Sequence, residues 1–271
     1  MLIFYTKSLP ASDPAFWPDF WKVNAAVVRE AFMPDFQAFQ QHVSPGAKVL
    51  DAGCGPGHLT REMIRKGYRA VGVDFDQLSI QWGVREYGSF PGAIANVTQL
   101  PYRSNIFDAV FLSGVAEHVP TGAGTAIQEC ARTLRPGGRL VVTLPYQNVV
   151  RKLYAPFYRI RTKLEREPRH FDQFVYNRAE IAALLQASGL RILNYRRTHY
   201  ITVLLRIPGI SSLHRAIFPP RPITAATPGE SKPLARGAPA GRLKPMAKTV
   251  VEGILNLLIA NRLTVVAEKM G

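Results

Sequence analysis

The sequence is poor in cysteine, poor in acidic residues and free of long apolar runs. It contains two cysteines, Cys54 and Cys130, whose number and separation fit neither a zinc-ligand pair nor a disulfide framework, so we expect no metal and a reducing, cytoplasmic setting. The N-terminus lacks a charged region followed by an apolar stretch, which argues against a secretory signal. The apolar run 254–260 is far shorter than the roughly 20 residues of a membrane-spanning helix, so no span is expected.

The shortage of acidic residues is confined to one half of the chain. The net charge is +15, yet residues 1–150 hold 13 Lys/Arg against 12 Asp/Glu, whereas residues 151–271 hold 21 against 7. Such asymmetry indicates an anionic partner, which could be a phosphorylated or carboxylated substrate, an acidic membrane surface or RNA. The alternative is a soluble surface that happens to be basic.

Between Val49 and Leu144 short β-branched or apolar runs alternate with amphipathic stretches, which is typical of βα units and a parallel sheet. Further on, a helix over 177–188 and a strand over 190–197 follow, and the run 263–267 predicts a last strand at the edge of the sheet. Within the alternating stretch we expect strands at about 47–51, 69–73, 92–95, 107–112 and 138–143, and helices at about 57–66, 77–87 and 122–134.

Three segments flank this core. Residues 16–42 predict an aromatic-rich helix, for which core packing is the expected role of most aromatics and covering of the sheet or a substrate pocket is the alternative. Residues 148–167 predict a basic helix. Seven prolines in 219–245 suit an extended loop or disordered basic segment before a helix over 246–260. The expected domains are a helical cover (1–44), a catalytic domain (45–203 with 262–271) and an insertion (204–261).

The strongest local motif is the run from Val49 to His58, in which glycines at 53, 55 and 57 open a helix directly after a strand. Glycine lets the backbone turn sharply and lets a ligand approach closely. Asp74 ends the next strand, where a carboxylate can accept the two hydroxyls of a ribose. A dinucleotide-binding Rossmann domain shares these features, but the Gly-x-Gly-x-Gly spacing speaks against it.

The run from Val49 to Gly57 resembles the first motif of class I S-adenosylmethionine-dependent methyltransferases. Three later stretches agree with the family in order: 71–76, then 96–101 with 107–110, and the Pro-Gly-Gly turn in 134–138. The resemblance covers roughly residues 45 to 200 plus the last strand. It implies a Rossmann-like, doubly wound α/β fold with a seven-stranded sheet, helices on both faces, an antiparallel last strand and S-adenosylmethionine as cofactor.

The resemblance also implies a set of cofactor-binding residues. The carboxylate of Asp51 would reach the methionine ammonium, Asp74 would bind the ribose, and Phe75 would pack on adenine. Asn96 stands where the family usually has Asp, and its side-chain carbonyl can still accept a hydrogen bond from the exocyclic amine. The remaining expected contacts are the glycines of the turn, the backbone N–H at the adenine and the methionine end: Gly53, Gly55, Gly57, Val97 and Ser113.

The acceptor side has fewer signals. The pair Glu117-His118 resembles one common in the subgroup that contains quinone-biosynthesis methyltransferases, and the histidine either takes a proton from an acceptor hydroxyl or packs beside the cofactor. Tyr146, after the fifth strand, and His170 are the other catalytic candidates, because this fold builds its acceptor pocket there. The sequence does not decide between O-, N- and C-methylation.

These residues support a methyltransferase acting on a small lipophilic or anionic acceptor, such as a quinone precursor, a lipid, a glycan carrier or a secondary metabolite. The apolar and basic spacing in 149–166, together with 204–261, predicts peripheral attachment to the inner face of an anionic membrane; a lid is the alternative. RNA is the weaker partner, because no base-binding motif of the Asn/Asp-Pro-Pro-Tyr type follows the fourth strand. A cofactor-binding module without turnover is the alternative outside the enzyme class.

Overall fold

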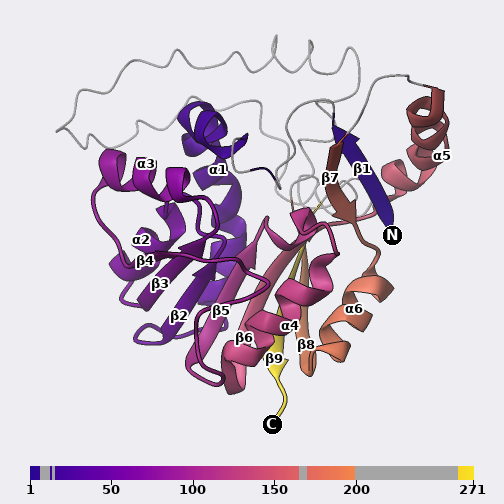
Figure 1. Cartoon of the computed structure of the whole chain (residues 1–271). Coiled ribbons are helices and arrows are strands. Elements are labelled where there is room, and N and C mark those ends of the chain that lie inside the picture. The colour runs from indigo at the N-terminus through magenta and orange to yellow at the C-terminus, as the bar shows by residue number, and fades with distance from the viewer. Residues whose placement is uncertain (7–12, 14–15, 165–169, 199–261) are drawn as a thin grey trace, which may run out of the picture.

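The computed structural model describes residues 1–6, 13, 16–164, 170–198 and 262–271 (Figure 1). The predicted insertion at 204–261, including the loop at 219–245 and the helix at 246–260, lies outside these described residues. In the described ranges, no helix has the length and apolarity to cross a bilayer. The elements are β1 Leu2–Thr6, α1 Trp17–Gln40, β2 Lys48–Ala52, α2 His58–Arg65, β3 Arg69–Asp74, α3 Gln77–Tyr87, β4 Gly92–Ile94, β5 Phe107–Ser113, a 3₁₀ turn Ala116–His118, α4 Ala123–Thr133, β6 Leu134–Pro145, α5 Val149–Leu164, β7 His170–Val175, α6 Arg178–Ala187, β8 Leu190–Thr198 and β9 Arg262–Lys269.

The main sheet has seven strands in the order β4-β3-β2-β5-β6-β9-β8, parallel from β4 to β6, with β9 antiparallel to both its neighbours. The predicted fold class is confirmed. The predicted place of the last strand is wrong: Ala267 pairs with Leu140 of β6 on one side and with Ile192 of β8 on the other, so β8 forms the edge. The buried run Leu263–Ala267 fits this interior place, because a central strand is covered on both faces.

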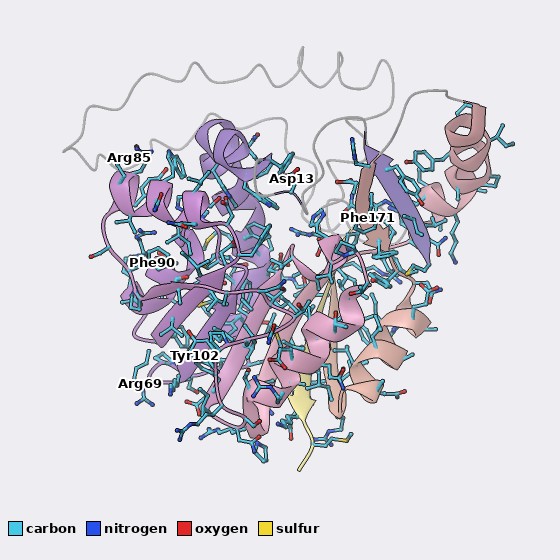
Figure 2. All side chains as sticks on the ribbon, viewed as in Figure 1. Asp13, Arg69, Arg85, Phe90, Tyr102 and Phe171 are labelled. Carbon is cyan, nitrogen blue, oxygen red and sulfur yellow. The ribbon has the colours of Figure 1, made fainter. Side chains whose placement is uncertain are left out.

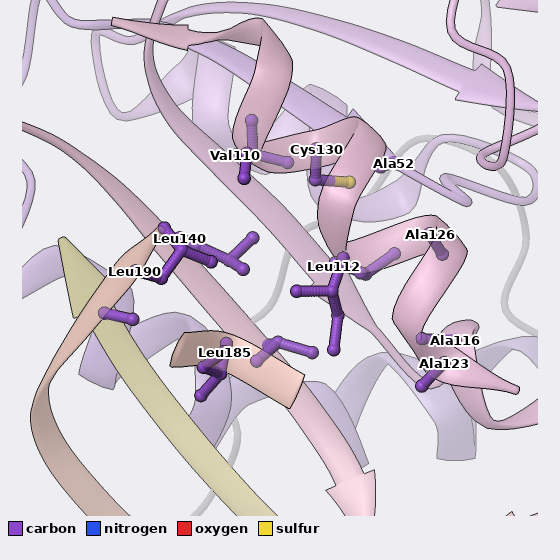
Figure 3. Close-up of a cluster of buried hydrophobic side chains, with 14 of the residues drawn as sticks. Ala52, Val110, Leu112, Ala116, Ala123, Ala126, Cys130, Leu140, Leu185 and Leu190 are labelled. Atoms are coloured by element: carbon purple, nitrogen blue, oxygen red, sulfur yellow. The ribbon is translucent and has the colours of Figure 1, made fainter. Parts of the chain in front are cut away.

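Helices cover both faces of the sheet. α1 and α2 pack on one face, where Phe36, Phe39 and Met63 are fully buried, and α3 contacts α1 (Figure 1). α4 and α6 cover the other face, where buried Ala, Leu and Cys side chains from helices and strands interlock, as Figure 3 shows around Leu112, Cys130 and Leu185. The carboxyl ends of the parallel strands therefore meet at one edge of a layered, rigid core.

A second, two-stranded sheet stands at that edge and was not predicted from the sequence. β1 pairs antiparallel with β7, with Leu2 opposite Val175. Phe171 on β7, labelled in Figure 2, lies with its ring 4.8 Å from that of Phe174 and packs against the main core. α5 packs beside β1 (Figure 1), so β1, β7 and α5 form a unit attached to the end of the main sheet.

Candidate active site

A cavity of about 810 Å³ opens at the carboxyl ends of the parallel strands. The cavity is lined by the segments that follow β2, β3, β4 and β5 and by aromatic side chains from α1, with contributions from α5, β7 and β9. Ligands of doubly wound α/β folds bind in this crevice, outside the carboxyl ends of the strands. The sequence-predicted residues that line it are Asp51, Gly53, Gly55, Asp74, Phe75, Asn96, Val97, Ser113 and His118.

The glycine turn lies close to its neighbours. Gly55 has φ +51°, and a Cβ there would meet the ring of Trp21 at 2.7 Å. Gly57 has φ +78° and precedes the first residue of α2, and unlike Gly53 and Gly55 it does not line the cavity. The left-handed backbone and the contact with Trp21 explain why glycine stands in this turn.

Asp51, the second-last residue of β2, is a buried carboxylate that lines the cavity. Its Oδ2 accepts a hydrogen bond from Thr60 Oγ1 at 2.6 Å. Burial raises the pKa of Asp51 to about 7, although the Thr60 hydrogen bond lowers it, and the charge of Asp74 raises it further. Such a carboxylate is charged at neutral pH only at a cost, which a cation in the cavity would offset.

Asp74 ends β3 and is hydrogen-bonded to two backbone amides. Gly55 N–H donates to Oδ2 at 2.7 Å, and Asp76 N–H donates to Oδ1 at 2.9 Å. Burial still raises the pKa of Asp74 to about 6 against these two hydrogen bonds. The neighbouring Asp76 caps α3 by accepting from Leu78 and Ser79, so its carboxylate is already used in shaping the helix start.

The wall after β4 has a different hydrogen-bond pattern from the one predicted. Asn96 is exposed, and its Oδ1 accepts both the backbone N–H and the hydroxyl of Thr98, each at 2.9 Å. The carbonyl that was expected to face an adenine amine is thus engaged in a local turn. Val97 lines the cavity and is buried, while Ser113 contacts Thr143 through their hydroxyls at 2.9 Å.

Of the three catalytic candidates, the structure brings only His118 to the cavity. His118 ends the 3₁₀ turn, and its Nδ1 lies 2.7 Å from the backbone carbonyl of Asp172 on β7. Tyr146 lies in a separate groove, below the guanidinium of Arg197, and His170 is exposed at the start of β7. Neither is among the residues that line the cavity.

The aromatic residues of α1 form another part of the cavity wall, and Trp21 packs against the glycine turn. Phe16, Trp17, Phe20, Trp21 and Phe32 line the cavity, and the rings of Trp17 and Trp21 stack with centroids 5.7 Å apart. Phe36 and Phe39 belong to the core, Phe32 packs against it, and Trp21 is buried while it also lines the cavity. Several of these aromatics therefore line the cavity, as the alternative of covering a pocket expected, because helical periodicity does not distinguish a core face from a face that lines a cavity.

Four of the polar cavity residues that sequence reasoning missed stand far from any motif. Arg151 comes from α5, Asp172 and Gln173 from β7, and Arg262 from the first position of β9. Arg262 lies 3.7 Å from the buried carboxylate of Glu117, which joins the 3₁₀ turn to the last strand. For Arg151 and Arg262, the only signal in the sequence was the basic character of the second half of the chain.

These features fit one kind of ligand, a cation linked to a vicinal diol. Comparison with known proteins agrees: residues 50–142 match the methyltransferase domain family. A demethylmenaquinone methyltransferase of Mycolicibacterium vanbaalenii is 30% identical over 193 residues, which cover 64% of this chain and 78% of the relative. The chain belongs to the class I S-adenosylmethionine-dependent methyltransferases. The enzyme's cofactor is S-adenosylmethionine, and its two buried carboxylates and glycine turn suit that molecule.

Further relatives of this methyltransferase support the assignment. The demethylmenaquinone methyltransferase of Mycolicibacterium paratuberculosis is 31% identical over 195 residues, covering 66% of this chain and 79% of the relative. Among solved structures, a methyltransferase from Methanosarcina mazei has a TM-score of 0.57 at 16% identity over 86% of this chain and 97% of its own. The 1,6-didemethyltoxoflavin N1-methyltransferase of Burkholderia thailandensis, solved with bound 1,6-didemethyltoxoflavin and S-adenosylhomocysteine, has a TM-score of 0.51 at 17% identity over 97% of this chain and 92% of its own. Likeness at this identity shows the shared fold.

Proposed function

We propose that this methyltransferase acts on a small lipophilic acceptor with an aromatic ring, of the quinone-precursor class, in the cytoplasm at the inner face of a membrane. The observation that carries the proposal is the aromatic lining of the cavity: the stacked rings of Trp17 and Trp21 line it together with the glycine turn and the buried carboxylates. Flat aromatic walls favour flat aromatic ligands, because stacking adds to the burial of apolar area. The names of the curated relatives point to the same class of acceptor.

The residues at the carboxyl ends of β2, β3, β4 and β5 would hold the cofactor. The Asp51 carboxylate would accept from the methionine ammonium and Asp74 from the ribose hydroxyls, while Ser113 lies on the methionine side. Phe75 and Val97 supply apolar surface for the adenine. Gly57 contributes indirectly by starting α2, and Asn96 contributes a local turn at the adenine end.

His118 is proposed as the general base. A carbonyl oxygen only accepts hydrogen bonds, so the contact with Asp172 requires the proton on Nδ1 and leaves the lone pair of the neutral imidazole on Nε2. Nε2 would take the proton of an acceptor hydroxyl as the methyl group arrives. S-adenosylmethionine, when bound, supplies that methyl group on a sulfonium that is already activated for transfer. The protein then needs mainly to align the two molecules and to exclude water.

Transfer of radiolabelled methyl groups from S-adenosylmethionine tests the proposal. The purified enzyme is offered detergent-dissolved naphthoquinols and alkylphenols, with unmodified transfer RNA and short peptides in parallel. We expect label in the aromatic acceptors, and Trp17→Ala should raise their KM about tenfold or more while cofactor affinity stays unchanged. Trp82→Ala, a tryptophan outside the cavity, is the matched control.

Two outcomes of this assay would contradict the proposal. If the RNA is labelled and the quinols are not, the protein would be a nucleic-acid methyltransferase. If the protein binds the cofactor but labels none of these acceptors, it would be a binding module without turnover.

A further inference from the structure

One side of α5 is apolar and exposed to solvent. Val149, Leu153, Phe157 and Ile160 follow one another at intervals of three or four residues, which places them on one side of the helix. Their exposed fractions are 46%, 78%, 60% and 59%. A contiguous exposed apolar row of this kind marks an interaction surface, unlike scattered single apolar residues.

The opposite side of α5 is fixed to the protein, so the apolar row keeps one direction. The Tyr158 hydroxyl accepts the backbone N–H of Tyr5 at 3.0 Å and donates to the carbonyl of the same residue at 3.3 Å. Its ring lies 4.8 Å from that of Phe4. Arg151 donates to the Tyr146 carbonyl at 3.0 Å, which anchors the first turn. These contacts occupy the side facing β1 and leave the apolar row facing outward.

The charges of α5 are of one sign. The helix contains no acidic residue, and exposed Lys152 stands beside the apolar row. Arg159 and Lys163 follow Lys152 at helical spacing. An apolar face bordered by basic residues is the pattern of a helix that lies in the interface of an anionic bilayer. A second copy of the chain would fit less well, because a two-fold contact would bring these like charges together.

The apolar row and the cavity share one structural unit. Arg151 of α5 and Asp172 of β7 line the cavity, and β7 pairs with the strand that holds α5. Figure 1 shows α5 projecting beyond β1 and β7, at the end of the molecule where the carboxyl ends of the main strands meet. A surface that held α5 would therefore lie next to the acceptor side of the cavity.

We propose that α5 docks on a bilayer containing anionic lipids, with Val149, Leu153, Phe157 and Ile160 inserted among the lipid acyl chains and Lys152 at the phosphate level. The inference deepens the proposed function and rests on it for its purpose, which is to deliver a lipophilic acceptor from the bilayer to the cavity. The docking itself requires only the helix surface.

Vesicle sedimentation of the full chain at low salt tests the docking, with phosphatidylcholine vesicles that either lack or contain about one third phosphatidylglycerol. We expect the protein to pellet with the anionic vesicles and to dissociate at high salt. Leu153→Glu and Ile160→Glu should each lower the bound fraction about tenfold or more, because a carboxylate would enter the apolar layer beside anionic lipid. Leu78→Glu is the matched control: Leu78 is 53% exposed on α3 and should bind like the unchanged protein.

Two further measurements make the result decisive. Leu153→Glu should keep the cofactor affinity and the rate with a detergent-dissolved acceptor, and should lose rate only with an acceptor embedded in vesicles. Binding to anionic vesicles that Leu153→Glu leaves unchanged would overturn the proposal, as would a dimer in solution that this substitution separates into monomers. If no acceptor is methylated, the proposed function fails, yet the sedimentation series still decides the docking.

Discussion

The backbone N–H of Gly55 donates a hydrogen bond to Oδ2 of Asp74 at 2.7 Å. This bond joins the glycine turn after β2 to the last residue of β3, and Asp74 lines the cavity at the same time. One carboxylate thus holds the glycine turn in place and lines the cavity.

Asp74→Ala should weaken binding of S-adenosylmethionine by roughly ten- to a hundredfold, the usual effect of losing hydrogen bonds to a charged group. Asp74→Asn should weaken it less, because an amide oxygen still accepts from Gly55. Calorimetric titration measures both. Asp108→Asn, which alters a carboxylate at the opposite end of the sheet beside Lys48, should leave the affinity unchanged. Undiminished binding by a folded Asp74→Ala protein would remove Asp74 from the site.

The stability of the cofactor-free enzyme should fall between about pH 4 and about pH 8 through two groups. Burial raises the pKa of Asp51 to about 7 and of Asp74 to about 6, above the value of about 4 in an unfolded chain. A raised carboxyl pKa contributes stability that is complete below the unfolded value and is lost as the pH rises through the folded value. Urea unfolding across this range measures the effect, and Asp51→Asn should reduce the slope.

The affinity for S-adenosylmethionine should change in the opposite direction. A charged Asp51 is required to meet the ammonium group, so binding should be roughly tenfold tighter at about pH 8 than at about pH 6 and should release protons. Titration in buffers of different ionisation enthalpy counts these protons. A pH-independent affinity would show that Asp51 is not the partner of the cation.

His118→Gln should lower kcat by roughly a hundredfold or more while leaving cofactor affinity intact, because only the proton acceptor is removed. Rescue by added imidazole discriminates a base from a packing residue: imidazole should restore part of the variant's rate. A lowered rate that imidazole leaves unchanged would assign His118 a positioning role. Tyr146→Phe, in the neighbouring groove, should behave like the unchanged enzyme.

Gly83→Ala should reduce both stability and cofactor affinity. A Cβ at this position of α3 would collide with the carbonyl oxygen of Pro56, which lies in the glycine turn. Overpacking of this kind costs about 1–3 kcal/mol and would displace the turn. Gly124→Ala in α4 is the control, because its Cβ would meet only the flexible end of Leu184 at 3.3 Å, and it should be neutral or slightly stabilising. Thermal unfolding with and without cofactor measures both variants.

The sequence predicted the elements whose signals are local. The strand and glycine turn around Asp51, and the helix that follows Asn177 with its capping box, lie close to where periodicity and capping residues indicated. β1 was missed because a five-residue strand is defined by its partner, and Leu2 pairs with the distant Val175. Periodicity also gave no means of telling which residues of α1 face a cavity, so the roles of Trp17 and Trp21 emerged only from the tertiary structure.

Because β9 lies between β6 and β8, we expect assembly of the cavity to be a late step of folding. Arg262, which contacts Glu117, belongs to β9, the strand that must enter between β6 and β8. Within that strand, Ala267 pairs with Leu140 of β6, which is more than a hundred residues earlier in the chain. Contacts between residues so far apart in sequence slow folding. Until β9 arrives, β6 and β8 each present an unpaired inner edge, so a nascent chain is most exposed to aggregation during that interval. Cofactor present during refolding should therefore affect yield only after the last strand has paired.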